Sequence, residues 1–338
     1  QGNLLDPGNT PEKNLKFLLF CGAVIRGVHL HGPLLRAVIA SAANDHRLGA
    51  NEAPPAILSV YLGDQLEKVF KDIQAGNLMP SVSGGEMDLG LSQILNFNRD
   101  PGDRNRTSPF AFTGNRFEFR AVGSSQSVSG PLVAMNTMLA DSLNWIAGKL
   151  EAALATGLDQ PAAVVSVLKE LMEKHGKVIF GGDGYSAEWH TKAVEENGLR
   201  NIPTTADALP AFLEDSVKTL FKSTGVLSPA ELESRYEVYS EQYILAIEVE
   251  AKLVVDMATT SIYPAAMSYL SELSDAIDSA ASIGVAMDAS LAKTLAAHTN
   301  AMTTAVTALS LALEETHFLS AETQMKYCAN DLRPLMDD

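Results

Sequence analysis

Apolar residues in the last third of the chain recur at the spacing of an α-helix, and this periodicity constrains the fold more than any other feature. Residues at this spacing share one helix face, which needs a partner surface that removes it from water. No strand-like alternation interrupts the pattern, so we predict a bundle of long antiparallel helices over residues 229–338. We expect Tyr243, Ile247, Leu295 and Leu309 to be buried in it. The two apolar stripes consist of Tyr236, Tyr239, Tyr243, Ile247, Val254 and Met257, and of Leu291, Leu295, Met302, Val306, Leu309 and Leu313.

The first two thirds of the chain mix helical periodicity with short apolar runs, which is typical of the α+β class. Gly32 and Pro33 should break or kink the first helix, and residues 44–55 are too polar and proline-rich for a core segment. We expect one domain over residues 1–225 and a helical extension over residues 226–338. The expected helices cover residues 11–30, 34–43, 64–75, 131–155 and 161–175, and the expected strands cover residues 57–62, 94–97, 110–112 and 116–122.

The composition excludes several kinds of partner. The 338 residues carry a net charge of −16 and 46% hydrophobic side chains, which indicates a globular chain with a sizeable core. The negative charge disfavours nucleic acids and anionic membranes. The two cysteines, Cys21 and Cys328, give no disulfide framework and fit a reducing cytoplasm. The longest apolar stretch, residues 17–25, is shorter than the roughly 20 residues that a membrane-spanning helix needs.

Residues 115–120, Asn-Arg-Phe-Glu-Phe-Arg, alternate charged and aromatic side chains with the period of a β-strand. Arg116, Glu118 and Arg120 should lie on one side, with Phe117 and Phe119 on the other. A carboxylate between two guanidinium groups can hold a metal ion while the arginines hold phosphoryl oxygens. The alternative interpretation is a strand with solvated ion pairs. Four arginines within residues 104–120 repel one another, which favours an anionic partner.

The loop expected over residues 44–55 is a second candidate site. Glu52 lies there between small and rigid residues, and a carboxylate on such a loop could close over a site and accept a proton from an amine. Arg47, on the same loop, could hold a substrate carboxylate. An ordinary surface loop with a solvated acid is the alternative interpretation.

Other motifs point to chemistry less clearly. Residues 181–186, Gly-Gly-Asp-Gly-Tyr-Ser, look like a phosphate cradle, but they match neither the dinucleotide fingerprint nor the P-loop spacing. A turn that ends with Ser186 as a helix cap is the favoured interpretation. His29 and His31 lie two positions apart on a helix and so do not share a face, which argues against a metal pair. The sequence contains no H-E-x-x-H, C-x-x-C, G-x-S-x-G or Walker motif.

Four segments resemble the glutamine synthetases, most closely their type III branch. The resemblance implies the carboxy-terminal half of a glutamine synthetase catalytic domain, a sheet or half-barrel with helices, followed by the antiparallel helical bundle. The segments are residues 44–55 (Asn-Asp-His-Arg-Leu-Gly-Ala-Asn-Glu-Ala-Pro-Pro), 103–108 (Asp-Arg-Asn-Arg-Thr-Ser), 114–125 (Gly-Asn-Arg-Phe-Glu-Phe-Arg-Ala-Val-Gly-Ser-Ser) and 184–189 (Gly-Tyr-Ser-Ala-Glu-Trp).

The resemblance also implies a reaction: ligation of ammonia to glutamate by ATP through γ-glutamyl phosphate, with Mg²⁺ or Mn²⁺, in a cytoplasmic, ring-shaped homo-oligomer. The implied residue roles follow the family's motifs. Arg47 would hold the glutamate carboxylate, Glu52 would take a proton from ammonium, Arg106 and Arg120 would stabilise the transferring phosphoryl group, Arg116 would bind nucleotide phosphate, and Glu118 would ligate a metal.

The chain departs from the family's pattern in three ways. Residues 109–113 contain no arginine where other branches carry one, the family's acidic strands and metal-binding histidine segment would precede Gln1, and the family's tail would follow Asp338. We therefore expect the second half of a longer enzyme that is inactive alone. Two alternatives stay open: a non-catalytic scaffold derived from a synthetase, and a glutamate ligase that uses a different amine.

Overall fold

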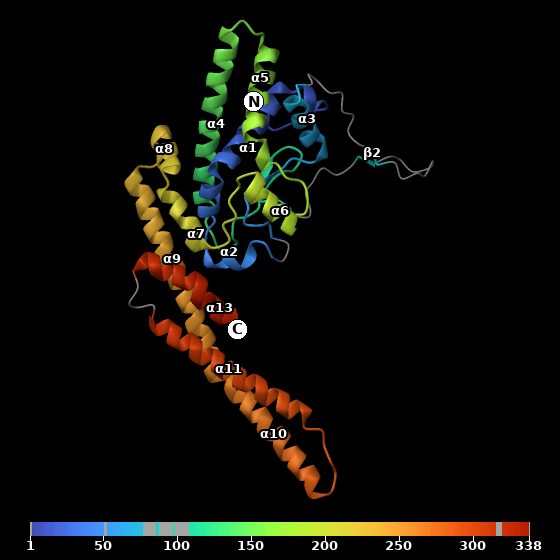
Figure 1. The fold of residues 1–338 in the computed structure, drawn as a ribbon, viewed down its shortest axis with the longest axis vertical. Coiled ribbons are helices and arrows are strands. Elements are labelled where there is room, and N and C mark those ends of the chain that lie inside the picture. Colours follow the sequence, from blue (N-terminus) through green and yellow to red (C-terminus); the bar gives the residue numbers. More distant parts are fainter. Residues whose placement is uncertain are drawn as a thin grey trace. The chain divides into compact units, whose positions relative to one another are not determined.

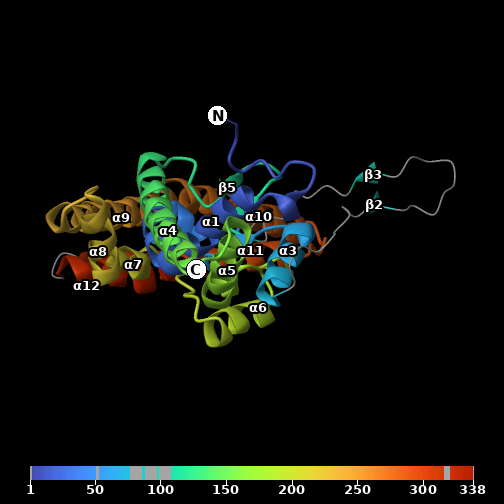
Figure 2. The same ribbon diagram turned by 90° about the horizontal axis from the view of Figure 1, so that it is seen from above.

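A computed structural model describes residues 2–50, 53–76, 86–87, 97–98, 108–315 and 320–337 (Figures 1 and 2). The chain divides into two compact units, Gln1–Tyr236 and Glu237–Asp338. The first unit contains helices and a small sheet, and the second contains helices only among its described residues. This is an α+β fold, as the sequence predicts.

Three long helices form the core of the first unit: α1 (Leu15–Ala37), α4 (Ser129–Ala155) and α5 (Gln160–His175). They lie side by side in Figure 1 and contact one another pairwise. Gly22 of α1 lets α5 approach closely, because a Cβ there would lie 3.1 Å from Leu171 Cδ1. A side chain at this position would push the two helices apart.

Helix α1 begins and ends later than the predicted residues 11–30. It starts at Leu15 with the Asn14 side chain as its cap, after a 3₁₀ turn η1 (Pro11–Lys13), so the start predicted at residue 11 was four residues early. By length and composition α1 could cross a membrane, but 67% of its most apolar window is buried inside the structure, as in a core helix. Cys21 on this helix is buried and free, and Cys328 of the second unit is too.

Helix α1 has the predicted kink near Gly32 and Pro33, but it ends at a different residue than predicted. His31 has non-helical dihedral angles immediately before Gly32 and Pro33, so the kink is confirmed. The helix then continues to Ala37, and a separate helix α2 (Ala42–Arg47) begins after Ser41, whose side chain accepts a hydrogen bond from the backbone N–H of Asn44. The predicted helix over residues 34–43 is therefore right for residues 34–37 and 42–43 but interrupted between them, and the predicted loop start at Asn44 was wrong because α2 continues to Arg47.

A three-stranded sheet has the order β1–β4–β5, with β1 (Val60–Tyr61) parallel to β4 (Phe110–Phe112) and β4 antiparallel to β5 (Phe117–Phe119). Strand β1 is shorter than the predicted residues 57–62. Gly114 has a φ of 98° in the β4–β5 turn, a value that favours glycine. Strands β2 (Glu86–Met87) and β3 (Phe97–Asn98) pair separately, and residues 94–96 of the predicted strand lie outside the described residues.

Short helices complete the first unit. Helix α3 closely matches the predicted residues 64–75, and Ser186 caps α6 by accepting from the backbone N–H of Trp189, so the turn interpretation of residues 181–186 is confirmed. The bounds are α3 (Asp64–Gln74), η2 (Gly176–Val178), α6 (Ala187–Thr191), η3 (Lys192–Glu196), α7 (Thr205–Ala208), η4 (Leu209–Leu213) and α8 (Asp215–Thr224).

The second unit is built from long helices. It contains α9 (Pro229–Met257) from Glu237 onward, and α10 and α11 run side by side with a turn at Gly284 between them (Figure 1). The π-helical turn η5 joins α9 to α10 just before Pro264. The remaining bounds are η5 (Ala258–Ile262), α10 (Tyr263–Ser282), α11 (Ser290–Glu315), α12 (Ala321–Tyr327), η7 (Cys328–Leu332) and α13 (Arg333–Asp337).

Burial in these helices follows the predicted stripes only in part. Tyr243, Ile247 and Leu309 are at most 2% exposed, as expected. Leu295 is only partly buried. At the outer ends of the stripes, Met257 is 56% exposed and so contradicts the prediction. Periodicity therefore identifies the inward face but not how far the partner helix extends along it.

Candidate functional site

One carboxylate on β5 lies between two arginines. Glu118 Oε1 accepts hydrogen bonds from Arg116 Nε at 3.2 Å and from Thr113 Oγ1 at 3.3 Å. Its Oε2 accepts from Arg120 Nε at 3.3 Å. The three charged side chains therefore lie on the same face, so the predicted alternation is confirmed. We call Arg116, Glu118 and Arg120 the β5 cluster.

The two phenylalanines of β5 lie on the opposite face. In the register of the hairpin, Phe119 pairs with Phe110 and Phe117 pairs with Phe112. The ring centroids of these pairs are 5.4 and 5.3 Å apart, and Phe112 in turn contacts Phe17 of α1 at 5.7 Å. This aromatic face joins the strand to the helical core, so the β5 cluster stands on a rigid support.

Glu118 is held in its ionised form. Burial alone would raise the pKa of this carboxyl, but hydrogen bonds from Arg116, Arg120 and Thr113, together with the charge of Arg120, lower the pKa below its ordinary value. The exposed fraction of the side chain falls from 68% for Arg116 to 16% for Arg120. A ligand therefore reaches Arg116 most easily, and Arg120 is the more fixed of the two arginines.

Arg47 of α2 is docked against the end of β5. Its Nη2 donates to the carbonyl of Arg120 at 2.9 Å, and its Nη1 donates to the carbonyl of Ala121 at 3.2 Å and to Asn44 Oδ1 at 3.1 Å. The structure thus brings together two segments that lie more than 70 positions apart in the sequence. Both terminal nitrogens of Arg47 bind the protein itself, so its observed role is to position α2 on the strand.

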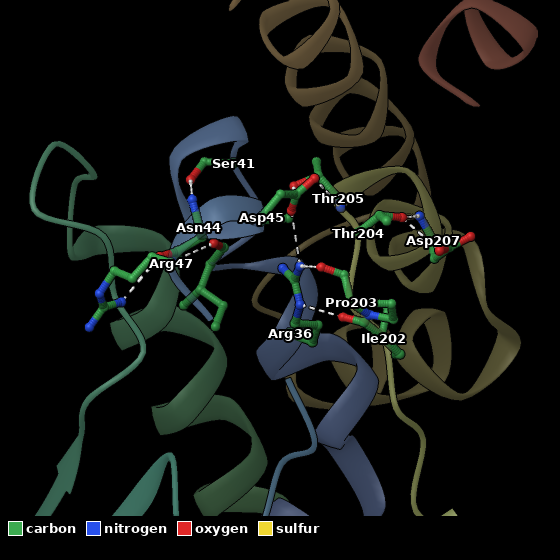
Figure 3. Close-up of polar contacts among 12 residues, drawn as sticks. Arg36, Ser41, Asn44, Asp45, Arg47, Ile202, Pro203, Thr204, Thr205 and Asp207 are labelled. Carbon is green, nitrogen blue, oxygen red and sulfur yellow. Dashed lines mark hydrogen bonds and ion pairs between the residues drawn. The ribbon is translucent and has the colours of Figure 1, made fainter. Parts of the chain in front are cut away.

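A buried polar network beside Arg47 holds α2 in place (Figure 3). Asn44 Nδ2 donates to the carbonyls of Ile39 and Ala121. Asp45 accepts from Arg36 Nη2 at 3.2 Å, and from the backbone N–H and the hydroxyl of Thr205 at 2.9 and 2.8 Å. The sequence analysis treated this stretch as a loop and missed the network, although Arg36 and Asp45 lie only nine positions apart.

The segment after α2 is closed by backbone hydrogen bonds and by a distant tyrosine. Gly49 N–H donates to the carbonyl of Pro54, and Ala53 N–H donates to the carbonyl of Ala50, both at 2.9 Å. The Tyr185 hydroxyl donates to the carbonyl of Ala53 at 2.7 Å. This bond links the first and fourth resembling segments, residues 44–55 and 184–189. Glu52 and Arg106, two of the predicted site residues, lie outside the described residues.

The histidines make a pair that the sequence did not indicate. His29 Nδ1 lies 3.0 Å from His175 Nδ1 of α5, whereas His31 Nε2 lies 3.9 Å from Asp141. Burial, together with the charges of His29 and Arg26, lowers the pKa of His175 to about 4, and burial and Lys177 lower the pKa of His29. In the part of the chain that the structure describes, no three histidine, cysteine, aspartate or glutamate side chains are grouped as for a metal ion.

Comparison with known proteins defines the class. Residues 163–281 match the glutamine synthetase C-terminal domain. Over 277 residues the chain is 43% identical to the type-3 glutamine synthetase of Dictyostelium discoideum. The matched region covers 82% of this chain and 37% of that protein. The chain is also 38% identical over 275 residues to the glutamine synthetase of Bacteroides fragilis (strain YCH46). This match covers 80% of this chain and 37% of that protein.

The α+β fold and the matched domain are those of a glutamine synthetase carboxy-terminal region. A third relative, the glutamine synthetase of Butyrivibrio fibrisolvens, is 38% identical over 81% of this chain and 39% of its own length. This chain belongs to the glutamine synthetase family, within which it is similar to type-3 proteins, and it spans about 37% of the length of the first relatives.

Proposed function

We propose that this chain is part of a glutamine synthetase that ligates ammonia to glutamate with ATP through γ-glutamyl phosphate. The β5 cluster carries the proposal, because an ionised carboxylate between two guanidinium groups can hold a divalent ion and phosphoryl oxygens side by side. The docking of Arg47 on the same strand supports it, since the cationic groups that the reaction needs are then gathered at one edge of the sheet.

The two arginines have distinct proposed roles. Both contact Glu118 through Nε, so the terminal nitrogens of the exposed Arg116 are geometrically able to bind nucleotide phosphate without breaking the ion pair. Arg120 is more buried, and its backbone carbonyl is held by Arg47. A fixed guanidinium suits the transferring phosphoryl group, whose charge is spread over several oxygens in the transition state. Arg106 is proposed to share this role.

Glu118 fits a ligand to Mg²⁺ or Mn²⁺. It supplies hard, ionised oxygen atoms, and its lowered pKa extends the ionised form to lower pH. A divalent ion bound there would neutralise charge on the phosphates. One carboxylate does not make a complete site, and the described residues hold no group of three such ligands. We therefore assign the other ligands to residues outside the described part of this chain.

The glutamate and ammonia end of the site is proposed to involve Arg47 and Glu52. Arg47 would bind the glutamate carboxylate with the N–H groups that do not hold the strand. Glu52 would accept a proton from ammonium, and the hydrogen bond from Tyr185 to the carbonyl of the adjacent Ala53 would anchor the segment that carries it.

The test is Glu118→Gln in the complete enzyme. The substitution is nearly isosteric but removes the charge, so we expect an unchanged fold, weaker binding of the divalent ion and a fall in kcat much larger than any rise in KM for glutamate. Glu170→Gln is the matched control. Glu170 also lies between two cationic side chains, Lys149 and Lys174, each 2.7 Å away, and its pKa is also lowered. It lies on α5, however, and is not part of the β5 cluster.

Arg120→Lys completes this test, since a point charge does not reproduce a planar guanidinium. We expect lower kcat with little loss of stability. Wild-type metal affinity and turnover in Glu118→Gln would mean that the β5 cluster is only a set of ion pairs on a strand. An equal fall in Glu170→Gln would mean that loss of any ion-paired glutamate explains the effect.

A further inference from the structure

The first unit has a cleft that the proposed function does not use. Its volume is about 460 Å³, and it is lined by residues from α3, from residues 176–182 and from α6 and η3. It lies toward the β1 edge of the sheet, where Phe180 N–H donates to the carbonyl of Val60, whereas β5 forms the other edge. None of its lining residues belongs to the β5 cluster.

The charge of this cleft is opposite to that of the chain. Lys71, Lys177 and Lys192 line it, against the single carboxylate of Glu67. Glu67 is paired with Lys71 at 2.6 Å. Among the residues that the structure describes, Lys177 and Lys192 have no carboxylate within ion-pair distance. In a chain with a net charge of −16, these lysines give the lining of the cleft a net positive charge.

One wall of the cleft is aromatic. Phe180 stacks on Trp189 with ring centroids 3.6 Å apart and an interplanar angle of 10°. Trp189 is 3% exposed, and its indole N–H is buried with no hydrogen-bond acceptor among the described residues. The Phe180–Trp189 stack therefore gives the cleft a flat apolar wall.

Glycines keep the cleft open. A Cβ at Gly181 would lie 3.3 Å from Glu67 Oε2, and a Cβ at Gly182 would lie 3.0 Å from Phe180 Cζ. A side chain at either position would displace the paired acid or the aromatic wall. The Gly-Gly pair that sequence reasoning assigned to a plain turn therefore also shapes a concave, cationic surface.

We propose that this cleft binds a small phosphate monoester in which the phosphate is attached to a flat apolar group. The lysines would hold the phosphate, and the flat group would lie along the Phe180–Trp189 wall. The volume exceeds what inorganic phosphate needs, and small-molecule sites usually combine an apolar wall with a few polar groups. This site is separate from the proposed catalytic function and does not depend on it.

Tryptophan fluorescence tests the proposal directly. The 338-residue chain contains two tryptophans, so Trp145→Phe leaves Trp189 as the only reporter. Phenyl phosphate is the probe, with isothermal calorimetry as a second readout. We expect a saturable change in Trp189 emission at millimolar concentrations and weaker binding of inorganic phosphate.

Variants separate this cleft from the β5 cluster. The double variant Lys177→Gln/Lys192→Gln should lower the affinity for phenyl phosphate at least about tenfold, because two charges are removed. The double variant Lys177→Arg/Lys192→Arg keeps both charges and should bind phenyl phosphate like the unmodified chain. Arg116→Gln is the control and should leave binding unchanged. No saturable binding by fluorescence or calorimetry, equal affinity in the glutamine double variant, equal affinity for inorganic phosphate, or loss of binding in Arg116→Gln would each overturn the proposal.

Discussion

Asp45→Asn tests whether the buried network beside Arg47 holds the candidate site in place. Asp45 and Arg36 form an ion pair at 3.2 Å whose side chains are 0% and 1% exposed. The same carboxylate accepts two hydrogen bonds from Thr205, which begins α7. Asparagine keeps the shape of the side chain but removes its charge and one of its two acceptor oxygens.

The expected loss of stability is about 3 to 5 kcal/mol, because the substitution leaves the guanidinium of Arg36 buried without its countercharge. Arg36 also donates to the carbonyls of Ile202 and Pro203, so it cannot leave the network without losing those bonds. The loss of one hydrogen bond to a charged group accounts for roughly 1.5 to 3 kcal/mol of this value. Removal of the buried charge accounts for the rest.

The assay is urea denaturation followed by tryptophan fluorescence. Trp145 and Trp189 both lie in the first unit, so their emission reports the unfolding of the part that contains Asp45. Asp207→Asn is the control: Asp207 accepts from Thr204 Oγ1 at 2.6 Å in the same region, but it is exposed, and we expect a loss below about 1 kcal/mol. Equal losses in the two variants, or a loss below about 1 kcal/mol in Asp45→Asn, would refute the reasoning.

Three further predictions concern the rest of the molecule. Leu309→Ala should cost about 2 to 5 kcal/mol in chemical denaturation because Leu309 is 1% exposed, whereas Leu311→Ala, at a position 60% exposed, should cost little. The lowered pKa of His175 favours its neutral form in the folded state, so the free energy of unfolding should be highest above pH 6.5 and should fall as the pH drops toward about 4. Chemical denaturation across this pH range should show a smaller fall in His175→Phe. The isolated 338-residue chain should release no phosphate that depends on both glutamate and ammonia, because its described residues hold no three-ligand metal group; such release in a coupled assay would refute this.

Elements with a strong local signal were predicted well from the sequence. Helix α3 has a clear apolar stripe, Ser186 is a typical capping residue, and the β4–β5 hairpin follows the alternation of phenylalanine with charged residues. Each of these signals depends on neighbours within a few positions, and such neighbours are visible without coordinates. The β5 cluster was predictable for the same reason, since its three members lie within five residues.

Helix α2 was missed because its stability is not local. Its polar residues argue for a loop, but Asn44 and Asp45 are buried, and their partners lie 77 and 160 positions away at Ala121 and Thr205. Likewise, His29 pairs with His175 across 146 positions. No periodicity within a segment indicates such partners.

By itself, the sequence determined the helix and strand periods, the charge alternation on β5 and the family. Only the tertiary structure decided that Arg47 docks on the carbonyls of Arg120 and Ala121, that Tyr185 anchors Ala53, and that Trp189 and three lysines share a cleft. The physical reason is that backbone propensity and amphipathicity act over a few residues, whereas a buried polar group is stable only where the folded chain supplies its partner.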